Sequence, residues 1–413
     1  AIVKVLKRLG DPQDSLPIIH VAGTNGKGSV SSTVASILGA GGFKVGLNSS
    51  PHLQSLNERI VVDGLPLESA ILGELCYDIK AAAEKELVEI SFHEAITAAS
   101  FLAFRELGLE WGVVEVGLGG RLDASNVISR PAATAIVSID FDHQAILGNS
   151  LGEIAAEKAG IIKPGSPLVS GFLGPEAEKV VCHKAKGVRH YRFGTDYGCA
   201  PVTDGADNTF GYWGKDFPIA PLARFEFSSP LAGMHQGHNL AVAATLGLVV
   251  GMGEDAVKKG LQQVYWPGRL ETVRVGNTDI MMDCAHNPAG IRSFMHYVKR
   301  HEKAAIDLTF GVLDTKNWQE MIDLLSPIVG HWRLILPDSE RALPLEQVKE
   351  QILLSGNEVR ISSYGTDYER LVSELVDTSV DGTRYLAGSM YMVGKIRSIL
   401  GLPWRPLWSR SAQ

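Results

Sequence analysis

The chain has 413 residues, enough for about two or three domains that each bury a hydrophobic core. Hydrophobic residues make up 45% of the chain and charged residues 21%, which excludes a disordered or fibrous protein. The 39 Lys and Arg residues against 46 Asp and Glu residues give a net charge of −7. Because phosphate binding over a large surface needs a basic protein, we expect no nucleic-acid partner.

Nothing in the composition indicates export or membrane insertion. The longest stretch without a charged residue, 233–253, is rich in Ala and Gly and contains two His, which favours a buried helix over a membrane span. No charged-then-apolar leader opens the sequence, and the four cysteines lie far apart without a CxxC spacing. We therefore expect a cytoplasmic protein with reduced thiols and no membrane partner.

Strand-like and helix-like patterns alternate from the start of the chain, which predicts a doubly wound α/β domain. Short apolar runs indicate buried strands of a parallel sheet, and longer amphipathic runs indicate helices. The expected strands are 17–22, 45–48, 111–116 and 133–139, and the expected helices are 29–39, 68–87 and 93–107.

A second α/β domain is expected after the break at Trp266-Pro267-Gly268, so the predicted domains are 1–268 and 269–413. A small antiparallel insert is expected near 190–230, where aromatic residues, Pro and Gly replace the earlier pattern. Helices at 235–252 and 254–264 return to the first domain. In the second domain the expected strands are 278–284, 305–312, 331–336 and 383–387, and the expected helices are 288–301, 316–326, 344–355 and 366–377.

The strongest chemical signal lies between the first strand and the first helix, where residues Gly23 to Ser29 read Gly-Thr-Asn-Gly-Lys-Gly-Ser. Glycines let the backbone approach an anion, the helix N-terminus adds positive potential, and Lys27 adds a full charge. The spacing differs from the standard GxxxxGK[ST] because Gly28 separates the lysine from the hydroxyl. A plain Gly-rich turn would need neither Lys27 nor the flanking hydroxyls, so we expect phosphate binding.

Other polar residues follow expected strands and are ambiguous when taken alone. Glu115 ends a strand directly before Gly117-Leu-Gly-Gly120, where a carboxylate could serve the nucleotide's Mg²⁺ or form a structural ion pair. His143 also follows a strand, although a lone His is more often a satisfied core residue. Lys158 lies 15 residues later, and a lone Lys is usually solvated surface.

Several sequence blocks together resemble the folylpolyglutamate synthase/dihydrofolate synthase family of the Mur ligase superfamily. The resemblance runs from about Arg8 to Lys163 and from Asn239 to Gly290, and more loosely to Met390. It implies a P-loop-containing, Mur-ligase-like central domain and a smaller Rossmann-like α/β C-terminal domain. The blocks are GTNGKGS, SPHL, EVGLGGRLDASN, DHQAILGNSLGEIAAEKAGIIK, HNLAVA, PGRLE and DCAHNP.

The resemblance also implies site residues, with Lys27, His143 and Lys158 as the catalytic ones. ATP would be held by Thr24, Asn25, Gly26, Lys27, Gly28, Ser29, Asn239, Arg269, Asp283 and His286. Two Mg²⁺ ions would be held by Ser50, Glu115, His143 and Lys158, with Lys158 carrying a carbamate. The pterin or pteroate part of the substrate would lie against Ser91, Phe92, His93, Glu94, Leu122, Asp123 and Ala124.

The reaction implied is ATP-dependent addition of L-glutamate to a folate through an acyl phosphate, by a monomer. Leu118 and Arg121-Leu-Asp123 favour a bifunctional enzyme that uses both dihydropteroate and tetrahydrofolate. Three departures from the family pattern stand out: Cys284 in place of Gly, a loose match at 311–317, and His93 in place of a more common aromatic or polar residue.

Two alternatives remain at this point. A peptidoglycan-precursor Mur ligase would carry a nucleotide-sugar-binding domain before the P-loop, whereas 22 residues precede Gly23. A nucleotide-binding regulator without catalysis would be expected to lack Glu115, His143 or Lys158, and all three are present. Both comparisons favour the folate ligase.

Overall fold

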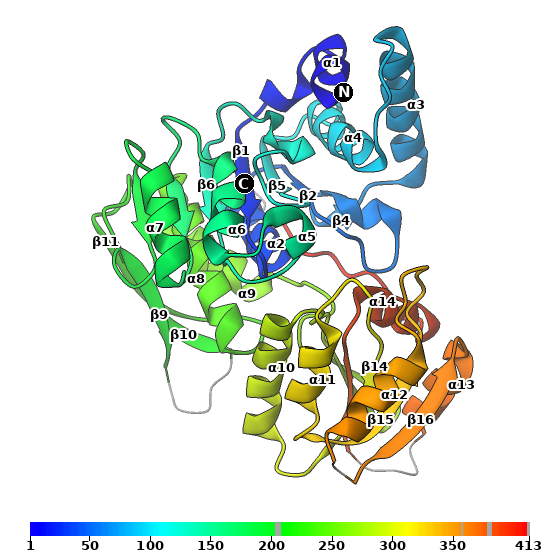
Figure 1. The fold of residues 1–413 in the computed structure, drawn as a ribbon. Coiled ribbons are helices and arrows are strands. Elements are labelled where there is room, and N and C mark those ends of the chain that lie inside the picture. The colour runs from blue at the N-terminus through cyan, green and yellow to red at the C-terminus, as the bar shows by residue number, and fades with distance from the viewer. Residues whose placement is uncertain (203–207, 357, 378–381, 411–413) are drawn as a thin grey trace. The chain divides into compact units, whose positions relative to one another are not determined.

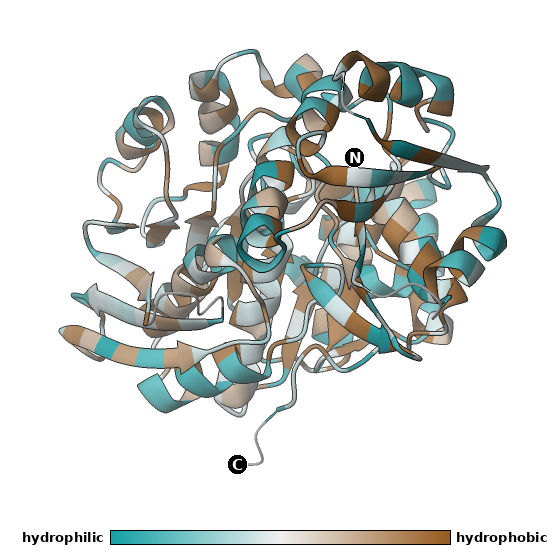
Figure 2. Cartoon of the chain, turned by 90° about the horizontal axis from the view of Figure 1, so that it is seen from below, coloured by the Kyte–Doolittle hydropathy of each residue, from teal (hydrophilic) through white to brown (hydrophobic). Residues whose placement is uncertain are grey.

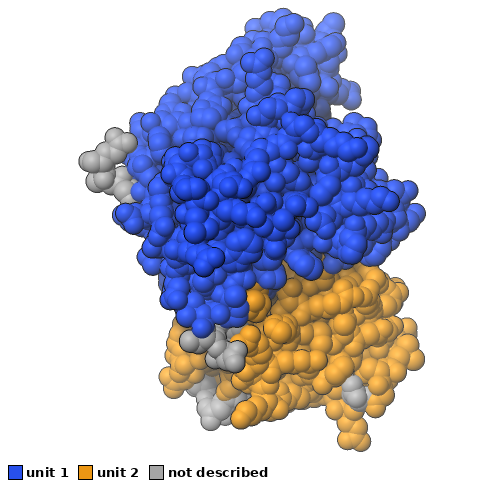
Figure 3. All heavy atoms as spheres, turned by 90° about the vertical axis from the view of Figure 1, so that its left-hand side faces the viewer, with its two compact units in different colours: residues 1–230, 235–266, 405–413 blue, residues 231–234, 267–404 orange. Residues whose placement is uncertain are grey.

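A computed structural model describes residues 1–202, 208–356, 358–377 and 382–410 (Figure 1). The chain divides into two compact units, which Figure 3 distinguishes by colour. Unit 1 comprises Ala1–Pro230, His235–Trp266 and Arg405–Gln413, and unit 2 comprises Leu231–Met234 and Pro267–Trp404. The chain therefore passes from unit 1 to unit 2 between Trp266 and Pro267, inside the predicted Trp-Pro-Gly break.

Unit 1 is built on an eight-stranded sheet with the order β4-β3-β2-β5-β1-β6-β7-β8. The six strands from β2 to β8 in this order are parallel, and β3 and β4 add an antiparallel edge. Strand β1 lies inside the sheet and is buried at every residue, including His20, the one polar residue among its apolar side chains. The strands are β1 (Ile18–Ala22), β2 (Val45–Asn48), β3 (Ile60–Val62), β4 (Leu65–Pro66), β5 (Trp111–Glu115), β6 (Ala133–Ile136), β7 (Leu168–Ser170) and β8 (His190–Arg192).

Helices cover the sheet of unit 1, and amphipathic bands of both colours run along individual helices in Figure 2. Helix α2 differs from these because every residue after Lys27 is buried, which fits its packing between the sheet and α9. The α-helices are α1 (Ile2–Arg8), α2 (Lys27–Ala40), α3 (Ser69–Lys85), α4 (Phe92–Glu106), α5 (Gln144–Leu147), α6 (Leu151–Lys158), α7 (Pro175–Lys184), α8 (Met234–Val249) and α9 (Glu254–Gln263), and the 3₁₀ turns are η1 (Pro12–Asp14), η2 (Leu56–Arg59), η3 (Ala124–Val127) and η4 (Ala159–Ile161).

The region 190–230, where an antiparallel insert is expected, has two parts. Strand β8 pairs in parallel with β7 and so belongs to the large sheet, not to an insert. The antiparallel part is a separate sheet of β9 (Tyr197–Pro201), β10 (Thr209–Lys215) and β11 (Leu222–Ser228); residues 203–207 lie outside the described part. Buried and exposed residues alternate along β11, so one face of this small sheet is apolar.

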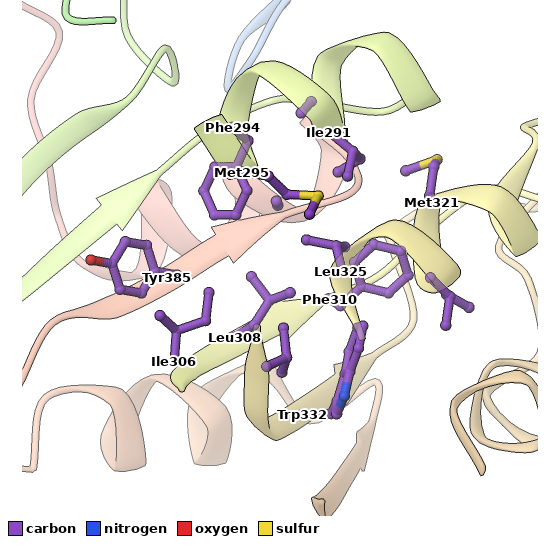
Figure 4. Packing of buried hydrophobic residues seen from close by; sticks show 14 of the residues in the cluster. Ile291, Phe294, Met295, Ile306, Leu308, Phe310, Met321, Leu325, Trp332 and Tyr385 are labelled. Carbon is purple, nitrogen blue, oxygen red and sulfur yellow. The ribbon is translucent and has the colours of Figure 1, made fainter. Parts of the chain in front are cut away.

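Unit 2 contains a six-stranded sheet with the order β12-β13-β17-β14-β15-β16 and an antiparallel β12–β13 pair at one edge. Helices α10 and α11 bury apolar side chains against Leu308, Phe310 and Trp332, with the Phe310 and Trp332 rings edge to face at 5.7 Å (Figure 4). The strands are β12 (Glu271–Val275), β13 (Thr278–Met282), β14 (Ile306–Phe310), β15 (Val329–Ile335), β16 (Arg360–Gly365) and β17 (Arg384–Ala387), and the helices are α10 (Pro288–His301), α11 (Trp318–Leu325), α12 (Leu345–Leu354), α13 (Tyr368–Leu375) and α14 (Met390–Ile399).

The expected second domain, 269–413, is wrong at its end, because the chain returns to unit 1 after Trp404. The backbone N–H of Leu407 donates to Gly64 O at 2.9 Å, and its carbonyl accepts from the N–H of Tyr265 at 2.8 Å. Trp408 is almost fully buried, and its ring occupies the space beside Gly39 of α2. Burial of this indole holds the return segment on unit 1. Among the residues described, no helix is both long and apolar enough to cross a bilayer.

Candidate active site

The loop between β1 and α2 lies at the carboxyl edge of the parallel sheet and is fixed by the segment after β6. The Thr24 hydroxyl donates to Asp140 O at 3.1 Å and accepts from the Asp140 N–H at 3.0 Å. The Asn25 N–H donates to the Ser138 hydroxyl at 3.0 Å. These bonds hold the loop so that it ends at the N-terminus of α2, where backbone N–H groups favour an anion.

Two glycines of this loop are needed for close contacts. Gly26 has φ = 82°, in the left-handed region, and a Cβ there would run into the side-chain amide of Asn239 on α8. A Cβ at Gly28 would lie 2.8 Å from Cζ2 of Trp266. The structure thus places Asn239 directly against the phosphate-binding loop, while its contact with a nucleotide stays a prediction.

A cation and a carboxylate meet at the loop. Lys27 Nζ donates to Thr24 O at 3.2 Å and lies 3.9 Å from Glu115 Oε1. The other oxygen of Glu115 accepts from the Ser50 N–H at 3.4 Å, and Glu115 is 4% exposed at the end of β5. The structure therefore brings together Lys27, Glu115 and Ser50, as expected for a site that binds phosphate and a metal ion.

The donor set around Glu115 fits Mg²⁺ held partly by a nucleotide. Among the described residues, no three or more His, Cys, Asp or Glu side chains form a group that could hold a metal ion alone. One carboxylate with nearby hydroxyl oxygens is the pattern of Mg²⁺ sites that share the ion with substrate phosphates. The Ser29 hydroxyl in the first turn of α2 is buried and has no hydrogen-bond partner in the described structure, so it has a free oxygen to offer.

Lys158 ends α6 and is 4% exposed, with Nζ donating to Gly23 O at 2.9 Å. Burial, with a further contribution from the charge of Lys27, lowers the pKa of Lys158 to about 7, while Asp142 opposes the shift. A neutral amine is therefore far more accessible near neutral pH than for an ordinary lysine. Lys158 is not the solvated surface lysine that it could have been from sequence alone.

His143 directly precedes α5 and has φ = 53°, an unusual conformation for a residue other than Gly. Its backbone N–H donates to Asp142 Oδ1 at 2.9 Å, and its ring atom Nε2 lies 3.8 Å from the same oxygen. The imidazole is about half exposed, so it is not a core residue. Its place among metal ligands stays a prediction.

Three residues expected at the nucleotide, Arg269, Asp283 and His286, belong to unit 2. The Asp283 carboxylate joins the segments that contain the other two. Asp283 accepts from the Leu270 N–H at 2.9 Å and the Ala285 N–H at 2.8 Å, which ties the segment after Arg269 to the segment before His286. Burial raises the pKa of Asp283, although the charge of Arg269 opposes the shift. The nucleotide contacts of Arg269, Asp283 and His286 stay predictions.

The expected substrate residues differ in their surroundings. Ser91 and Glu94 form the capping box of α4, in which the Glu94 N–H donates to the Ser91 hydroxyl at 3.3 Å and the Ser91 N–H donates to the Glu94 carboxylate at 2.9 Å. Phe92 and Leu122 are 58% and 79% exposed and are open to a ligand. Ala124 begins η3 and is half-buried. Substrate contact by any of these stays a prediction.

His93 and Asp123 lie together, with His93 Nε2 3.2 Å from Asp123 Oδ2. Sequence reasoning missed two residues that extend this pair inward. The Ser125 hydroxyl donates a hydrogen bond to Asp123 Oδ1 at 2.5 Å, and His20 Nε2 on β1 lies 2.8 Å from the same hydroxyl. The available signal was His20 itself, a polar residue in the middle of the apolar run Ile18–Ala22.

Comparison with known proteins agrees with this geometry. Residues 21–247 match the Mur ligase middle domain family. The chain is 34% identical to folylpolyglutamate synthase of Lacticaseibacillus casei over 97% of this chain and 93% of that protein. It is 32% identical to dihydrofolate synthase/folylpolyglutamate synthase of Bacillus subtilis over 96% of this chain and 93% of that protein.

Solved structures give the same result. Folylpolyglutamate synthase of Mycobacterium tuberculosis, complexed with ADP and AMPPCP, has a TM-score of 0.86 and 29% identity over 98% of this chain and 95% of that one. FolC of E. coli, in complex with DHPP and ADP, has a TM-score of 0.85 and 27% identity over 97% and 92%. The α/β fold expected from the resemblance is confirmed, and the chain belongs to the folylpolyglutamate synthase/dihydrofolate synthase family of ATP-dependent Mur ligases.

Proposed function

We propose that the protein adds L-glutamate to folate substrates and that it accepts both dihydropteroate and tetrahydrofolate. The observation that carries the proposal is the arrangement of Lys27, Lys158 and Glu115 around the loop between β1 and α2. Lys27 and the N-terminus of α2 suit the binding of a triphosphate, and Glu115, with Lys158 close to the loop, suits the binding of a metal ion. Curated relatives named for one or both of these synthase activities support the two substrates.

The reaction is the formation of an amide in two transfers. An oxygen of the substrate carboxylate attacks the γ-phosphorus of ATP, and the bond to ADP breaks. The glutamate nitrogen then attacks the acyl carbon, phosphate leaves with the bonding electron pair, and the nitrogen loses a proton. Lys27 neutralises the phosphate oxygens, and the N-terminus of α2 orients them, so no protein nucleophile is needed.

Two Mg²⁺ ions would be held by Ser50, Glu115, His143 and Lys158. When bound they neutralise phosphate charge and polarise the oxygens that react. A lysine ammonium would repel such ions, whereas a carbamate on Lys158 supplies the anionic oxygen that Mg²⁺ prefers. The lowered pKa of Lys158 supports this assignment because only the neutral amine reacts with CO₂.

The protein is expected to act as a monomer in the cytoplasm. Its four cysteines, Cys76, Cys182, Cys199 and Cys284, are free, which suits a reducing compartment. None of the steps above uses a second copy of the chain.

The decisive experiment measures ADP release with dihydropteroate and with tetrahydrofolate, each with and without L-glutamate. Glutamate-dependent release with both substrates is expected, and release with neither overturns the proposal. Release with one substrate alone restricts the enzyme to that single step. Labelling the substrate carboxylate with heavy oxygen tests the acyl phosphate, because the released phosphate must then carry the label.

A further inference from the structure

Helix α2, which follows the phosphate-binding loop, contains two glycines, and each of them faces a tryptophan. A Cβ at Gly28 would lie 2.8 Å from Cζ2 of Trp266, and a Cβ at Gly39 would lie 2.6 Å from Cδ1 of Trp408. The spacing from Gly28 to Gly39 is about three helical turns, so both glycines lie on one face of α2. Glycine is unfavourable inside a helix, and here each one makes room for an indole.

The two tryptophans come from distant segments that are hydrogen-bonded to each other. Trp266 lies in the segment that follows α9, and Trp408 lies in the return segment, residues 405–410. The residues directly before the two tryptophans form the bond, because the N–H of Tyr265 donates to Leu407 O at 2.8 Å. The two indoles are therefore attached to neighbours of one hydrogen-bonded pair.

The return segment belongs to no helix or strand, yet it is anchored on both sides. The Leu407 N–H donates at 2.9 Å to the carbonyl oxygen of Gly64, in the turn between β3 and β4. Gln263 Nε2, at the end of α9, donates to Ser409 O at 3.0 Å. Leu407 is fully buried and Trp408 is 1% exposed, so both side chains are removed from water. These contacts make the return segment a fixed part of unit 1.

Helix α9 supports α2 between the two indoles. The Ser36 hydroxyl of α2 donates to Gly260 O of α9 at 2.8 Å, and a Cβ at Gly260 would lie 2.4 Å from Cα of Ile37. The two helices therefore pack with their backbones close together. Because α9 ends only three residues before Trp266, the helix that packs on α2 leads directly to the indole beside Gly28.

The contact at Gly28 lies where α2 would face an anion. Gly28 is in the first turn of the helix, between Lys27 and Ser29, and the backbone N–H groups of that turn have no acceptor within the helix. Since Gly28 has no side chain, the Trp266 ring faces the backbone itself. A shift of this ring would therefore move the N–H groups that are expected to hold the phosphates.

We propose that Trp266 and Trp408 are positioning residues for the phosphate-binding loop. Trp266 holds the first turn of α2 in place. Trp408 holds the far end of the same helix, and its return segment keeps Trp266 in position through the bond between Tyr265 and Leu407. The inference rests on the proposed function only for the binding of a nucleotide at this loop.

The binding test measures ADP affinity by calorimetry, and KM for ATP and for the folate, in full-length variants. Trp266→Ala and Trp408→Ala should each weaken ADP binding and raise KM for ATP about tenfold, with KM for the folate unchanged. Trp408→Phe, which keeps an aromatic ring, should recover most of the affinity. Phe101→Ala is the control, because Phe101 is fully buried on α4 of unit 1, and it should lose stability without losing ADP affinity.

Gly39→Ala tests the far contact without removing an indole. The new Cβ would displace the Trp408 ring and should weaken ADP binding, although Gly39 lies roughly 16 Å along the helix from Gly28. In the Trp408→Ala background the same substitution should have no further effect, because the space beside Gly39 is then open.

Hydrogen exchange without nucleotide separates this inference from the proposed function. The peptide that covers residues 23–31 should exchange faster in Trp266→Ala and Trp408→Ala than in the wild type, relative to the peptide of β5, and Phe101→Ala should leave this ratio unchanged. A wild type that binds no ADP but shows these differences would refute the proposed function and still support the role of the indoles in holding α2.

Other results would overturn the inference. If the wild type binds ADP and Trp266→Ala binds it equally tightly, the indole does not position the loop. Equal losses of ADP affinity in Phe101→Ala and Trp408→Ala would show that general destabilisation is the cause. If Trp408→Ala does not fold, Trp408→Phe and Gly39→Ala decide, since unchanged affinity and unchanged exchange in both exclude the role of Trp408.

Discussion

Gly26→Ala tests whether the phosphate-binding loop is shaped by its contact with Asn239. The new Cβ faces two costs, which can be estimated separately. A left-handed φ of 82° costs an Ala roughly 1–2 kcal/mol. The Cβ would also lie 2.9 Å from Cγ and 3.0 Å from Nδ2 of Asn239, and overpacking of this kind costs about 1–3 kcal/mol. The free energy of unfolding should therefore fall by roughly 2–5 kcal/mol.

Gly165→Ala is the matched control, because Gly165 has φ = 81° but a Cβ there would meet nothing within 4 Å. It should lose only the roughly 1–2 kcal/mol of backbone strain in urea unfolding and keep its ADP release. Gly26→Ala should lose more stability and most of its activity, since Lys27 follows directly. Adding Asn239→Ala should recover the steric part of the stability. Equal losses in Gly26→Ala and Gly165→Ala, with activity retained, would refute the contact.

Four shorter predictions follow from the same structure. Lys27→Ala should abolish ADP release with an unchanged melting temperature; a variant with more than about a tenth of the wild-type rate, an effect under ~1.4 kcal/mol, would show that Lys27 does not clamp the phosphates. Lys158→Ala should be nearly inactive and partly restored by acetate, whereas a fully active variant would remove Lys158 from the mechanism. Arg269→Ala should weaken ATP binding more than folate binding in separate titrations, and the reverse order would contradict its assignment. Asp307 is half-buried, and this partial burial raises its pKa, but its hydrogen bonds to His331 and Arg333 outweigh the effect and lower the pKa to about 2. Because the folded pKa lies below the unfolded value of 3.8, the ionised Asp307 stabilises the fold above that pH by about 2 kcal/mol, and this advantage disappears between about pH 4 and pH 2. Urea unfolding of wild type and Asp307→Asn across this range should show the difference shrink as pH falls, and a constant difference would contradict the shift.

The parallel strands and the phosphate-binding loop could be predicted because their signals are local. The apolar run of β1, the glycines after it and Lys27 lie within ten residues, so neighbouring positions already contain the strand, the turn and the charge. The same holds for Glu115, whose place at the end of an apolar strand puts it at the carboxyl edge of the sheet.

Features that depend on distant contacts could not be predicted in this way. Strand β12 has no continuously buried face, since its residues alternate between half-buried and exposed, so the apolar signal of a core strand is missing. The return of Leu407 and Trp408 to unit 1 depends on contacts with Gly64 and Gly39, more than 340 residues earlier in the chain. No pattern near residue 407 indicates which unit these side chains join.

The surroundings of the loop between β1 and α2 explain the lowered pKa of Lys158, which ends α6. Lys27 and Lys158 both donate to carbonyl oxygens of this loop, to Thr24 and Gly23, while Glu115 supplies one negative charge beside Lys27. Burial lowers the pKa of Lys158, and the charge of the half-buried Lys27 lowers it further, while the charge of Asp142 opposes the shift. An anionic phosphate at the loop would restore the charge balance and favour the protonated amine, whereas a carbamate would reverse the sign of Lys158 and favour a cation beside it. On the proposed assignment, the charge of Lys158 would depend on what binds at the loop, so that a lysine could stand where a permanent cation would oppose a metal ion.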